Sequence, residues 1–458
     1  MKKSLFFVSV LSAAVLQAAV PKYVFIFIGD GMSTPQRMVA EDFAAKIGCE
    51  FAMNRLPYQA TTRTRSANAI ITDSAAAATA IACGEKTDNG MVGVASDGTR
   101  LESVAEVAKR RGMKVGVMTT VTIVHATPAG FYAHNRNRGE SYSIALDLIA
   151  SGFDYFAGGG VYDKFDDRKA KGYRGNVFDL ARQAGYTVNR NDLAGWKALK
   201  PGSKSWSVFG DYGMQFAIDA DGSEPTLAEL VRKGIEVLDN PKGFFLMCEG
   251  GKVDYAGHAN DAATNLRDVL ALDDGVKVAL AWEAAHPGET LVIVTGDHET
   301  GGLSMGFAGI GGAFRIEMLK DQKVSCEKFS SDVKRLIKER KGEIAFEEML
   351  PALKERFGLD KLDGTETKTL RKAFEDDVAN VRNKLRDTTA HDVKRRYVFA
   401  QAVKNVLNAR AGIGWSSGSH TALPTLTTAK GAGAEILVGM TENSDIARRL
   451  KKLLDVER

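Results

Sequence analysis

An acid and a hydroxyl stand directly in front of a run of small residues in this sequence. Thr72, Asp73 and Ser74 precede the alanine-rich stretch 75–82. Asp and Ser are favoured helix N-caps and Ala is the best helix former, so the stretch predicts a helix that begins near Ser74. The position also suits chemistry, because a hydroxyl among the uncovered N–H groups of a helix start can attack an electrophile and then hold an anion. The local residues allow both interpretations, a cap and a nucleophile.

Ionisable residues recur where predicted strands end, or in the glycine-rich turns beside those ends. Any one of them could be a turn residue or a structural histidine. Four of the seven histidines share this placement, however, and together they favour metal binding. Mixed sets of His, Asp and Glu suit zinc, whereas all-oxygen sets suit magnesium. The candidate residues are Asp30, His125, Thr127, Glu249, Asp254, His258, Asp297, His298 and His420.

Short apolar runs must position these side chains. The runs 23–31, 113–121, 243–254 and 290–302 alternate with helical patterns and resemble strands that are buried on both faces. A further strand is expected near Ile70. The alternation predicts an α/β fold with a mainly parallel central sheet sandwiched by helices. Ligands of such sheets bind at the carboxyl ends of the strands, where the candidate residues lie.

The sequence changes character after Phe307. From about Lys320 to Lys404 it is charge-dense, with apolar residues at three- and four-residue spacing. We expect a single α/β domain over residues 20–458, interrupted by a helical cap or crown-like insertion at about 308–412. Sheet-like sequence is expected to resume around 434–440, followed by a closing helix.

The first residues predict export. Lys2 and Lys3 precede an apolar run at 5–16 and small residues at 17–19, which is the pattern of a signal peptide over residues 1–19. The run is too short to span a bilayer comfortably, and no later segment reaches that length. We therefore expect a periplasmic or extracellular protein without a membrane span.

Charge and cysteine content limit the remaining classes. The formal net charge is +4 over 458 residues, and Lys and Arg are mixed with Asp and Glu, so no nucleic-acid binding is expected. Four cysteines allow three complete pairings, but two of them lie in apolar segments and fit buried free thiols equally well. The cysteines are Cys49, Cys83, Cys248 and Cys326.

Six motifs, taken in order, resemble the alkaline phosphatases. They are GDGMS, TDSAAAATAIACGEKT, HATPAG, EGGKVDYAGH, TGDHETGG and GSHT, and the resemblance runs from about Lys22 to Leu453. It implies a hydrolase that cleaves small phosphate monoesters through a phosphoserine at Ser74 and releases inorganic phosphate and an alcohol. The hydroxyl in front of the alanine run is then the nucleophile as well as part of a helix start.

The resemblance also implies two zinc ions and one magnesium ion. The three expected ligand sets are Asp254, His258 and His420 for the first zinc; Asp30, Asp297, His298 and the Ser74 oxygen for the second; and Asp30, Thr127 and Glu249 for magnesium. The family's phosphate-binding arginine lies four residues after a histidine that matches His134, which selects Arg138, with Arg136 as the alternative.

Two positions depart from the family pattern. Some bacterial members carry Asp at the place of His125, so His125 is expected to contact the third metal or a water bound to it. Zinc or cobalt are then alternatives to magnesium at that site. Tyr255 stands where better-known relatives have Lys or His, and it offers a hydroxyl to phosphate or water but no fixed positive charge. Weaker phosphate binding is expected.

Several alternatives remain. Phosphodiesterases of the same superfamily generally lack the third metal site and its glutamate, whereas this chain has Glu249 at that place. Sulfatase chemistry is excluded, because Ser74 is followed by three alanines and not by the x-Pro-x-Arg segment of sulfatases. A metal- or phosphate-binding protein without turnover would not need a nucleophile. The helical insertion is expected either to mediate formation of a homodimer or to gate substrates.

Overall fold

The computed structural model describes residues 20–162, 164–307, 314–386 and 398–455. The expected signal peptide, 1–19, lies outside the described residues. In the described part, a sheet of ten strands runs through the molecule in the order β14-β2-β13-β8-β1-β7-β3-β4-β6-β5. The strands in chain order are β1 (Tyr23–Gly29), β2 (Tyr58–Arg63), β3 (Lys114–Thr122), β4 (Tyr155–Gly159), β5 (Thr187–Arg190), β6 (Ser205–Val208), β7 (Phe244–Gly250), β8 (Thr290–Gly296), β13 (Thr425–Gly431) and β14 (Gly439–Glu442).

The sheet is mainly parallel. Strand β1 pairs in parallel with β7 on one side and β8 on the other, whereas β13 pairs antiparallel with both β8 and β2. All seven residues of β1, of β7 and of β8 are buried, as their continuous apolar runs predict for strands covered on both faces. The predicted α/β fold with a mainly parallel central sheet is confirmed.

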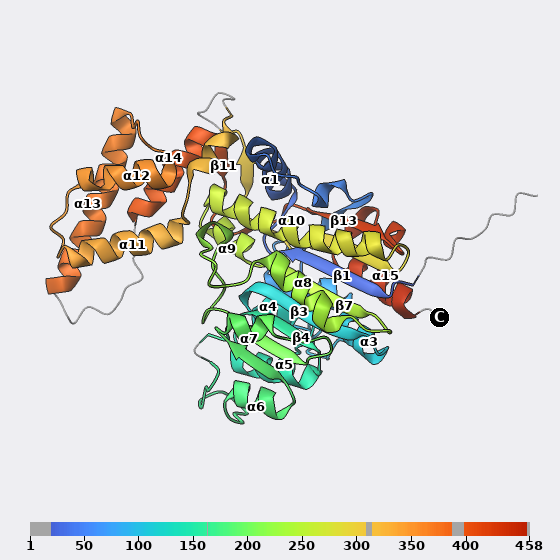
Figure 1. The fold of residues 1–458 in the computed structure, drawn as a ribbon. Coiled ribbons are helices and arrows are strands. Elements are labelled where there is room, and N and C mark those ends of the chain that lie inside the picture. Colours follow the sequence, from blue (N-terminus) through green and yellow to red (C-terminus); the bar gives the residue numbers. More distant parts are fainter. Residues whose placement is uncertain (1–19, 163, 308–313, 387–397, 456–458) are drawn as a thin grey trace, which may run out of the picture.

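Helices cover both faces of the sheet, and alternate residues of β1 belong to two different cores. Phe25 and Phe27 pack with helices α1, α8 and α10, whereas Ile26 and Ile28 pack with α2, α3, α5 and α15. Figure 1 shows α8 and α10 lying across one face. The helices outside the insertion are α1 (Thr34–Ile47), α2 (Ser74–Cys83), α3 (Val104–Arg110), α4 (Ala126–Ala129), α5 (Ser141–Ser151), α6 (Val177–Gln183), α7 (Leu193–Lys197), α8 (Leu227–Leu238), α9 (Lys252–His258), α10 (Ala262–Ala285) and α15 (Ser444–Asp455), with short 3-10 turns η1 (Met53–Arg55), η2 (Ala217–Asp219) and η5 (Ala434–Ile436).

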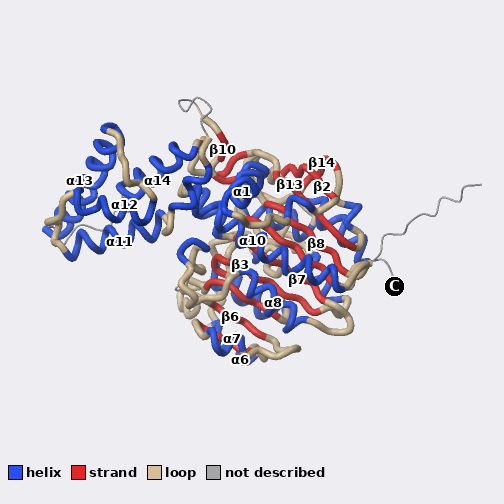
Figure 2. Tube along the Cα trace, turned by 45° about the horizontal axis from the view of Figure 1, so that its top comes forward, coloured by secondary structure: helices blue, strands red, loops and turns tan. Residues whose placement is uncertain are grey.

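The insertion forms a helical lobe beside the sheet (Figures 1 and 2). It leaves the domain at β10 (Leu303–Met305) and returns at β11 (Ile413–Trp415), and these two short strands pair antiparallel. Phe329, Phe357, Phe374 and Phe399 pack their rings together inside the lobe. The elements of the lobe are η3 (Ile316–Asp321), α11 (Cys326–Glu339), η4 (Phe346–Met349), α12 (Leu350–Phe357), α13 (Gly364–Arg386) and α14 (Val398–Ala411).

Two local predictions were wrong. No strand lies near Ile70, whose side chain is exposed in a loop between β2 and α2. Asn89 stabilises the loop, because it donates to the Ile71 carbonyl and accepts from the Asp73 N–H. The apolar pair Ile70 and Ile71 therefore lies in a loop and not in a strand. The stretch 434–440 begins as the turn η5, and pairing resumes only at β14. Among the described helices, none is long and apolar enough to cross a membrane.

Candidate metal centre and nucleophile

Ser74 is the first residue of α2, and Asp73 is its N-cap. The Asp73 side chain accepts a hydrogen bond from the Ala76 N–H at 3.0 Å, so the predicted cap is present. Every residue of α2 is buried, which its small side chains permit. The Ser74 hydroxyl is 2% exposed and its Oγ lies 3.2 Å from His298 Nε2. The helix start therefore holds a hydroxyl against one of the predicted metal ligands.

Asp254, His258 and His420 form the first of three groups of side chains whose ligand atoms converge. Helix α9 carries Asp254 and His258 one turn apart, with 3.4 Å between Asp254 Oδ2 and His258 Nε2. His420 joins them from the far side of the insertion, because the two-residue strand β12 (His420–Thr421) pairs with β9 (Glu299–Thr300). Its Nε2 lies 3.6 Å from Asp254 Oδ1.

Asp30, Asp297 and His298 form the second group. Strands β1 and β8 are neighbours with Gly29 opposite Gly296, so the residues that follow them meet at one edge of the sheet. His298 Nε2 lies 3.3 Å from Asp30 Oδ1 and 3.2 Å from Asp297 Oδ2. All three residues are fully buried.

Asp30 also belongs to the third group, with His125 and Glu249. His125 Nδ1 lies 3.6 Å from Asp30 Oδ2 and 3.8 Å from Glu249 Oε1. Thr127 donates from Oγ1 to Asp30 Oδ2 at 3.2 Å, which brings its hydroxyl to the same place. The third group is thus an oxygen-rich set with one imidazole.

The three groups fit metal ions. Four of their buried polar atoms have no hydrogen-bond partner among the described residues, and these are Asp30 Oδ1, His125 Nδ1, Glu249 Oε1 and Asp297 Oδ2. Burial among neighbouring carboxylates raises the pKa of Asp30 and of Asp297 well above the usual range, and burial beside His420 and Arg138 lowers the pKa of His298. Divalent cations would satisfy these atoms and offset the crowded negative charge.

Residues that the sequence did not single out orient the imidazoles. His258 Nδ1 lies 2.8 Å from the Gly418 carbonyl and His420 Nδ1 lies 2.9 Å from the Thr72 carbonyl. A carbonyl only accepts, so each Nδ1 carries the proton and each Nε2 offers its lone pair towards the carboxylates. Thr300 donates to Asp254 Oδ1 at 2.5 Å and lies 3.3 Å from His298 Nδ1. In the sequence, only the position of Thr300 two residues after His298 could have indicated that it contacts these ligands.

Arg138 lies at the site and Arg136 does not. One Arg138 nitrogen donates to Asp73 Oδ2 at 3.0 Å, and another lies 3.1 Å from His125 Nε2. Arg136 instead donates to the backbone carbonyl of Asp97 in an exposed loop. A guanidinium beside the start of α2 can bind two oxygens of a phosphoryl group.

Tyr255 lies between the third group and the surface. Its ring centroid is 6.2 Å from that of His125, and its hydroxyl hydrogen-bonds with Tyr162. Burial raises the pKa of Tyr255 well above its usual range, so the hydroxyl stays protonated at alkaline pH. It can donate to an oxygen but cannot supply charge.

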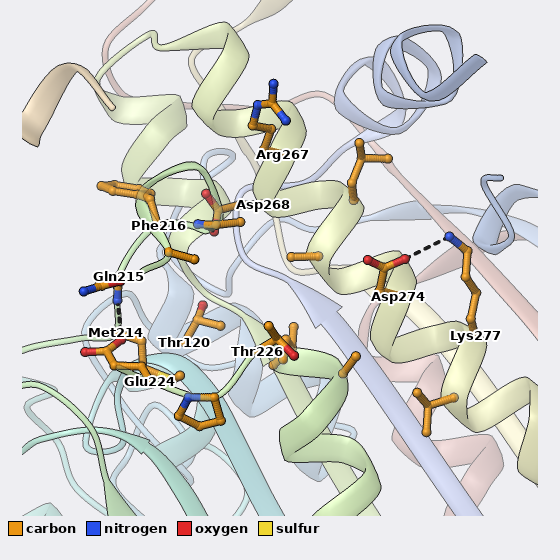
Figure 3. Close-up of a pocket in the computed structure, with 18 of the residues that line it drawn as sticks. Thr120, Met214, Gln215, Phe216, Glu224, Thr226, Arg267, Asp268, Asp274 and Lys277 are labelled. Carbon is orange, nitrogen blue, oxygen red and sulfur yellow. Dashed lines mark hydrogen bonds and ion pairs between the residues drawn. The ribbon is translucent and has the colours of Figure 1, made fainter. Parts of the chain in front are cut away.

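A cavity of about 780 Å3 lies elsewhere, between α8, α10 and the 214–226 segment (Figure 3). Met214, Phe216 and the buried Asp268 are among its lining residues, but none of the candidate metal ligands or Ser74 is. The volume of this cavity therefore does not locate the ligand groups, which converge elsewhere among buried side chains.

Comparisons with known proteins agree on one family. A family model described as alkaline phosphatase matches residues 21–456. Alkaline phosphatase 3 of Bacillus subtilis (strain 168) is 30% identical over 451 residues, which cover 94% of this chain and 89% of that protein. The crystal structure of a cold-active alkaline phosphatase from a psychrophilic Shewanella species has a TM-score of 0.81 and 27% identity, covering 94% of this chain and 99% of that one. A histidine-to-aspartate variant of the TAB5 alkaline phosphatase, with magnesium in its M3 site, has a TM-score of 0.67 and 26% identity, covering 96% and 100%.

Proposed function

The chain belongs to the alkaline phosphatase family, and on that premise we propose which of its residues carry the reaction. The protein is a metal-dependent phosphomonoesterase, and its cofactors are zinc and magnesium ions. The role of each residue is our proposal. It is supported above all by the Ser74 hydroxyl, which lies 3.2 Å from His298 at the start of α2, beside three converging ligand groups.

We propose that each ligand group holds one ion. Asp254, His258 and His420 would hold the first zinc. Asp30, Asp297, His298 and the Ser74 oxygen would hold the second, whereas Asp30, Thr127 and Glu249 would hold magnesium, with His125 in contact with that ion or its water. When bound, such ions stabilise charge on the transferring phosphoryl group and favour the deprotonated form of a neighbouring hydroxyl.

The chain's own groups then perform two displacements at phosphorus. Ser74 Oγ loses its proton and attacks phosphorus in line, and the bond from phosphorus to the alcohol oxygen breaks. The leaving oxygen takes the bonding electrons and picks up a proton, so the alcohol departs. The product is a phosphoserine, which water attacks from the opposite side to release inorganic phosphate and restore Ser74. Arg138 would bind two phosphoryl oxygens throughout, and the uncovered N–H groups of α2 would favour the negative charge.

The protein would be exported, because residues 1–19 have the pattern of a signal peptide. Its partners would be small phosphate monoesters and not nucleic acids. The lobe at about 308–412 would interrupt one catalytic domain over 20–458 and either form a homodimer contact or restrict substrates.

Hydrolysis of an aryl phosphate at alkaline pH tests the proposal. The matching aryl sulfate and bis-aryl phosphate diester are assayed in parallel, before and after chelation and after restoring zinc and magnesium. We expect chelator-sensitive monoester turnover, and loss of at least about a thousandfold in Ser74→Ala. Equal metal content in Ser74→Ala would show that the ligand groups are intact. Turnover of the diester alone would instead favour a phosphodiesterase, and full activity in Ser74→Ala would reject the assigned nucleophile.

A further inference from the structure

A second cavity, of about 500 Å3, lies beside the ligand groups. One wall is α9, the helix that carries Asp254 and His258, and the opposite wall is the beginning of α11 in the lobe. The segment 211–219 closes it between them. Its lining includes Phe216, Asp219, Lys252, Tyr255, Lys328 and Ser331.

Lys252 is the unusual member of this lining. The residue is only 7% exposed, yet its ammonium has no hydrogen bond or ion pair among the residues that the structure describes. The ammonium instead lies over two aromatic rings, 4.0 Å from the centroid of Phe216 and 5.3 Å from that of Tyr255. The backbone N–H of Lys252 donates to Thr120 Oγ1 at 3.1 Å, which fixes the start of α9.

An ammonium in this position requires a partner. Burial of a charge is costly unless an opposite charge or hydrogen-bond acceptors compensate it, and contact with two ring faces supplies only part of that compensation. All three N–H groups of the ammonium are donors and none can accept. An anionic oxygen of a bound molecule would supply the hydrogen-bond acceptor that the ammonium lacks among the described residues.

The acidic residues nearby do not fill this role. Asp219 accepts from the Ser325 N–H at 2.9 Å at the start of α11. Asp211 and Glu327 also line the cavity, but neither makes an ion pair with Lys252 in the described structure. Asp268 and Glu224, which line the larger cavity together with Phe216 (Figure 3), interact electrostatically with Lys252, but neither makes a hydrogen bond or ion pair with its ammonium in the described structure. Lys328 adds a second positive charge to the lining.

The cavity begins one side chain away from the phosphoryl-binding arginine. Lys252 and Tyr255 are three residues apart and share a face of α9. The Tyr255 ring centroid lies 5.3 Å from the Lys252 ammonium and 6.2 Å from the His125 ring centroid, and His125 Nε2 is 3.1 Å from Arg138. Tyr255 thus borders both this cavity and the surroundings of Arg138.

We propose that Lys252 and this cavity form a subsite for an anionic group on the alcohol part of the substrate. The preferred substrates would be phosphate monoesters whose alcohol carries a carboxylate or a second phosphate. The inference rests on the proposed phosphomonoesterase function and names the substrate class of that same site. The lobe then contributes to selectivity, because α11 supplies the outer wall.

The test compares phenyl phosphate with 3-carboxyphenyl and 4-carboxyphenyl phosphate. For each enzyme the ratio of kcat/KM for a carboxylated substrate to that for phenyl phosphate is measured. The intrinsic reactivity of the substrates cancels when the ratios of two enzymes are compared. We expect the ratio for at least one isomer to fall about tenfold in Lys252→Met, as for loss of one charge-assisted hydrogen bond. Lys252→Arg should largely restore it.

Two further variants make the result independent of Lys252 itself. Lys338→Met removes the same charge from an exposed position on α11 outside the cavity, and it should leave the ratio unchanged. Ser331→Trp fills the cavity from the exposed side of α11 without replacing Lys252, and it should also lower the ratio. This variant serves the purpose if Lys252→Met does not fold.

The failures are distinguishable. Turnover of phenyl phosphate with the same ratio in Lys252→Met, Ser331→Trp and the unmodified enzyme would overturn the subsite and leave Lys252 as a packing residue. The same fall in Lys338→Met would overturn it as well, because general electrostatics would then explain the preference. Failure of the unmodified, fully metallated enzyme to hydrolyse any of the three esters would overturn the proposed function itself.

Discussion

The Asp73 carboxylate joins the start of α2, the helix that begins at Ser74, to the Arg138 guanidinium. Its Oδ1 accepts from the Ala76 N–H at 3.0 Å, and its Oδ2 accepts from Arg138 and from the Gly90 N–H, each at 3.0 Å. One side chain therefore caps α2 and fixes the cation that faces Ser74. The helix cap and the proposed phosphoryl-binding geometry therefore depend on the same side chain.

Asp73→Asn should separate these two tasks. Asn is as good an N-cap as Asp, so the stability loss should be small, whereas Asp73→Ala should cost about 1 kcal/mol. Both variants lose the charged partner of Arg138, and the inhibition constant for phosphate should rise about tenfold in each. Thermal unfolding and phosphate inhibition measure the two effects. Unchanged phosphate inhibition in both variants would show that Arg138 does not depend on Asp73.

His125→Asp should change the metal preference of the third group. The substitution turns a set with one imidazole into an all-oxygen set, which favours magnesium over zinc and cobalt. We expect reactivation of the chelated enzyme to need about tenfold less magnesium once the two zinc ions are restored. The variant also removes the Arg138 contact, so phosphate inhibition is measured alongside. Equal magnesium requirements in the two proteins would contradict the assigned role of His125.

Tyr255→Lys should tighten phosphate binding. A fixed positive charge would replace a neutral hydroxyl that lies beside the third group, and the inhibition constant for phosphate should fall several-fold. Tyr255→Phe is the matched control, since it removes the hydrogen bond to Tyr162 without adding charge. The idea fails if the lysine variant binds phosphate no more tightly than the phenylalanine variant.

Asp268 should make stability fall as the pH rises. Burial raises its pKa to about 7, above its value in the unfolded chain. The folded protein then holds a proton that the unfolded chain has released between about pH 4 and 7, so stability is complete below that window and declines through it. Asp268→Asn should be more stable than the unmodified protein at pH 8 by about 2 kcal/mol, with a smaller or reversed difference at pH 4. Thermal midpoints at constant metal concentration measure this, and a pH-independent difference would contradict it.

Residue type and spacing predicted much of the candidate site. Asp30 and Asp297 follow apolar runs that become neighbouring strands, and Asp254 and His258 are one helical turn apart, so their meeting follows from sheet and helix geometry. The Thr72 and Gly418 carbonyls that orient His420 and His258 could not be predicted, because every residue has a carbonyl and only the folded loops bring these two near.

Other features depend on long-range packing. The Lys252 ammonium has no ion pair among the residues described here, and this is visible only once Phe216 and the lobe are positioned around it. A lysine three residues before a tyrosine is ordinary on a helix surface. The strand expected near Ile70 was wrong for the opposite reason. A short apolar pair satisfied the local pattern, but hydrogen bonds with Asn89 stabilise an exposed loop there.

The two short strand pairs at the base of the lobe also affect how the lobe can diverge in sequence and length during evolution. Leu303 pairs with Trp415, and Thr300 pairs with His420. The segments that precede and follow the lobe are therefore paired with each other at its base, next to the ligand groups. Insertions or deletions in the lobe, between β10 and β11, should therefore leave this pairing, and with it His420, in place. The lobe can therefore diverge in size and sequence as an exchangeable module, while the catalytic scaffold beneath it stays in register.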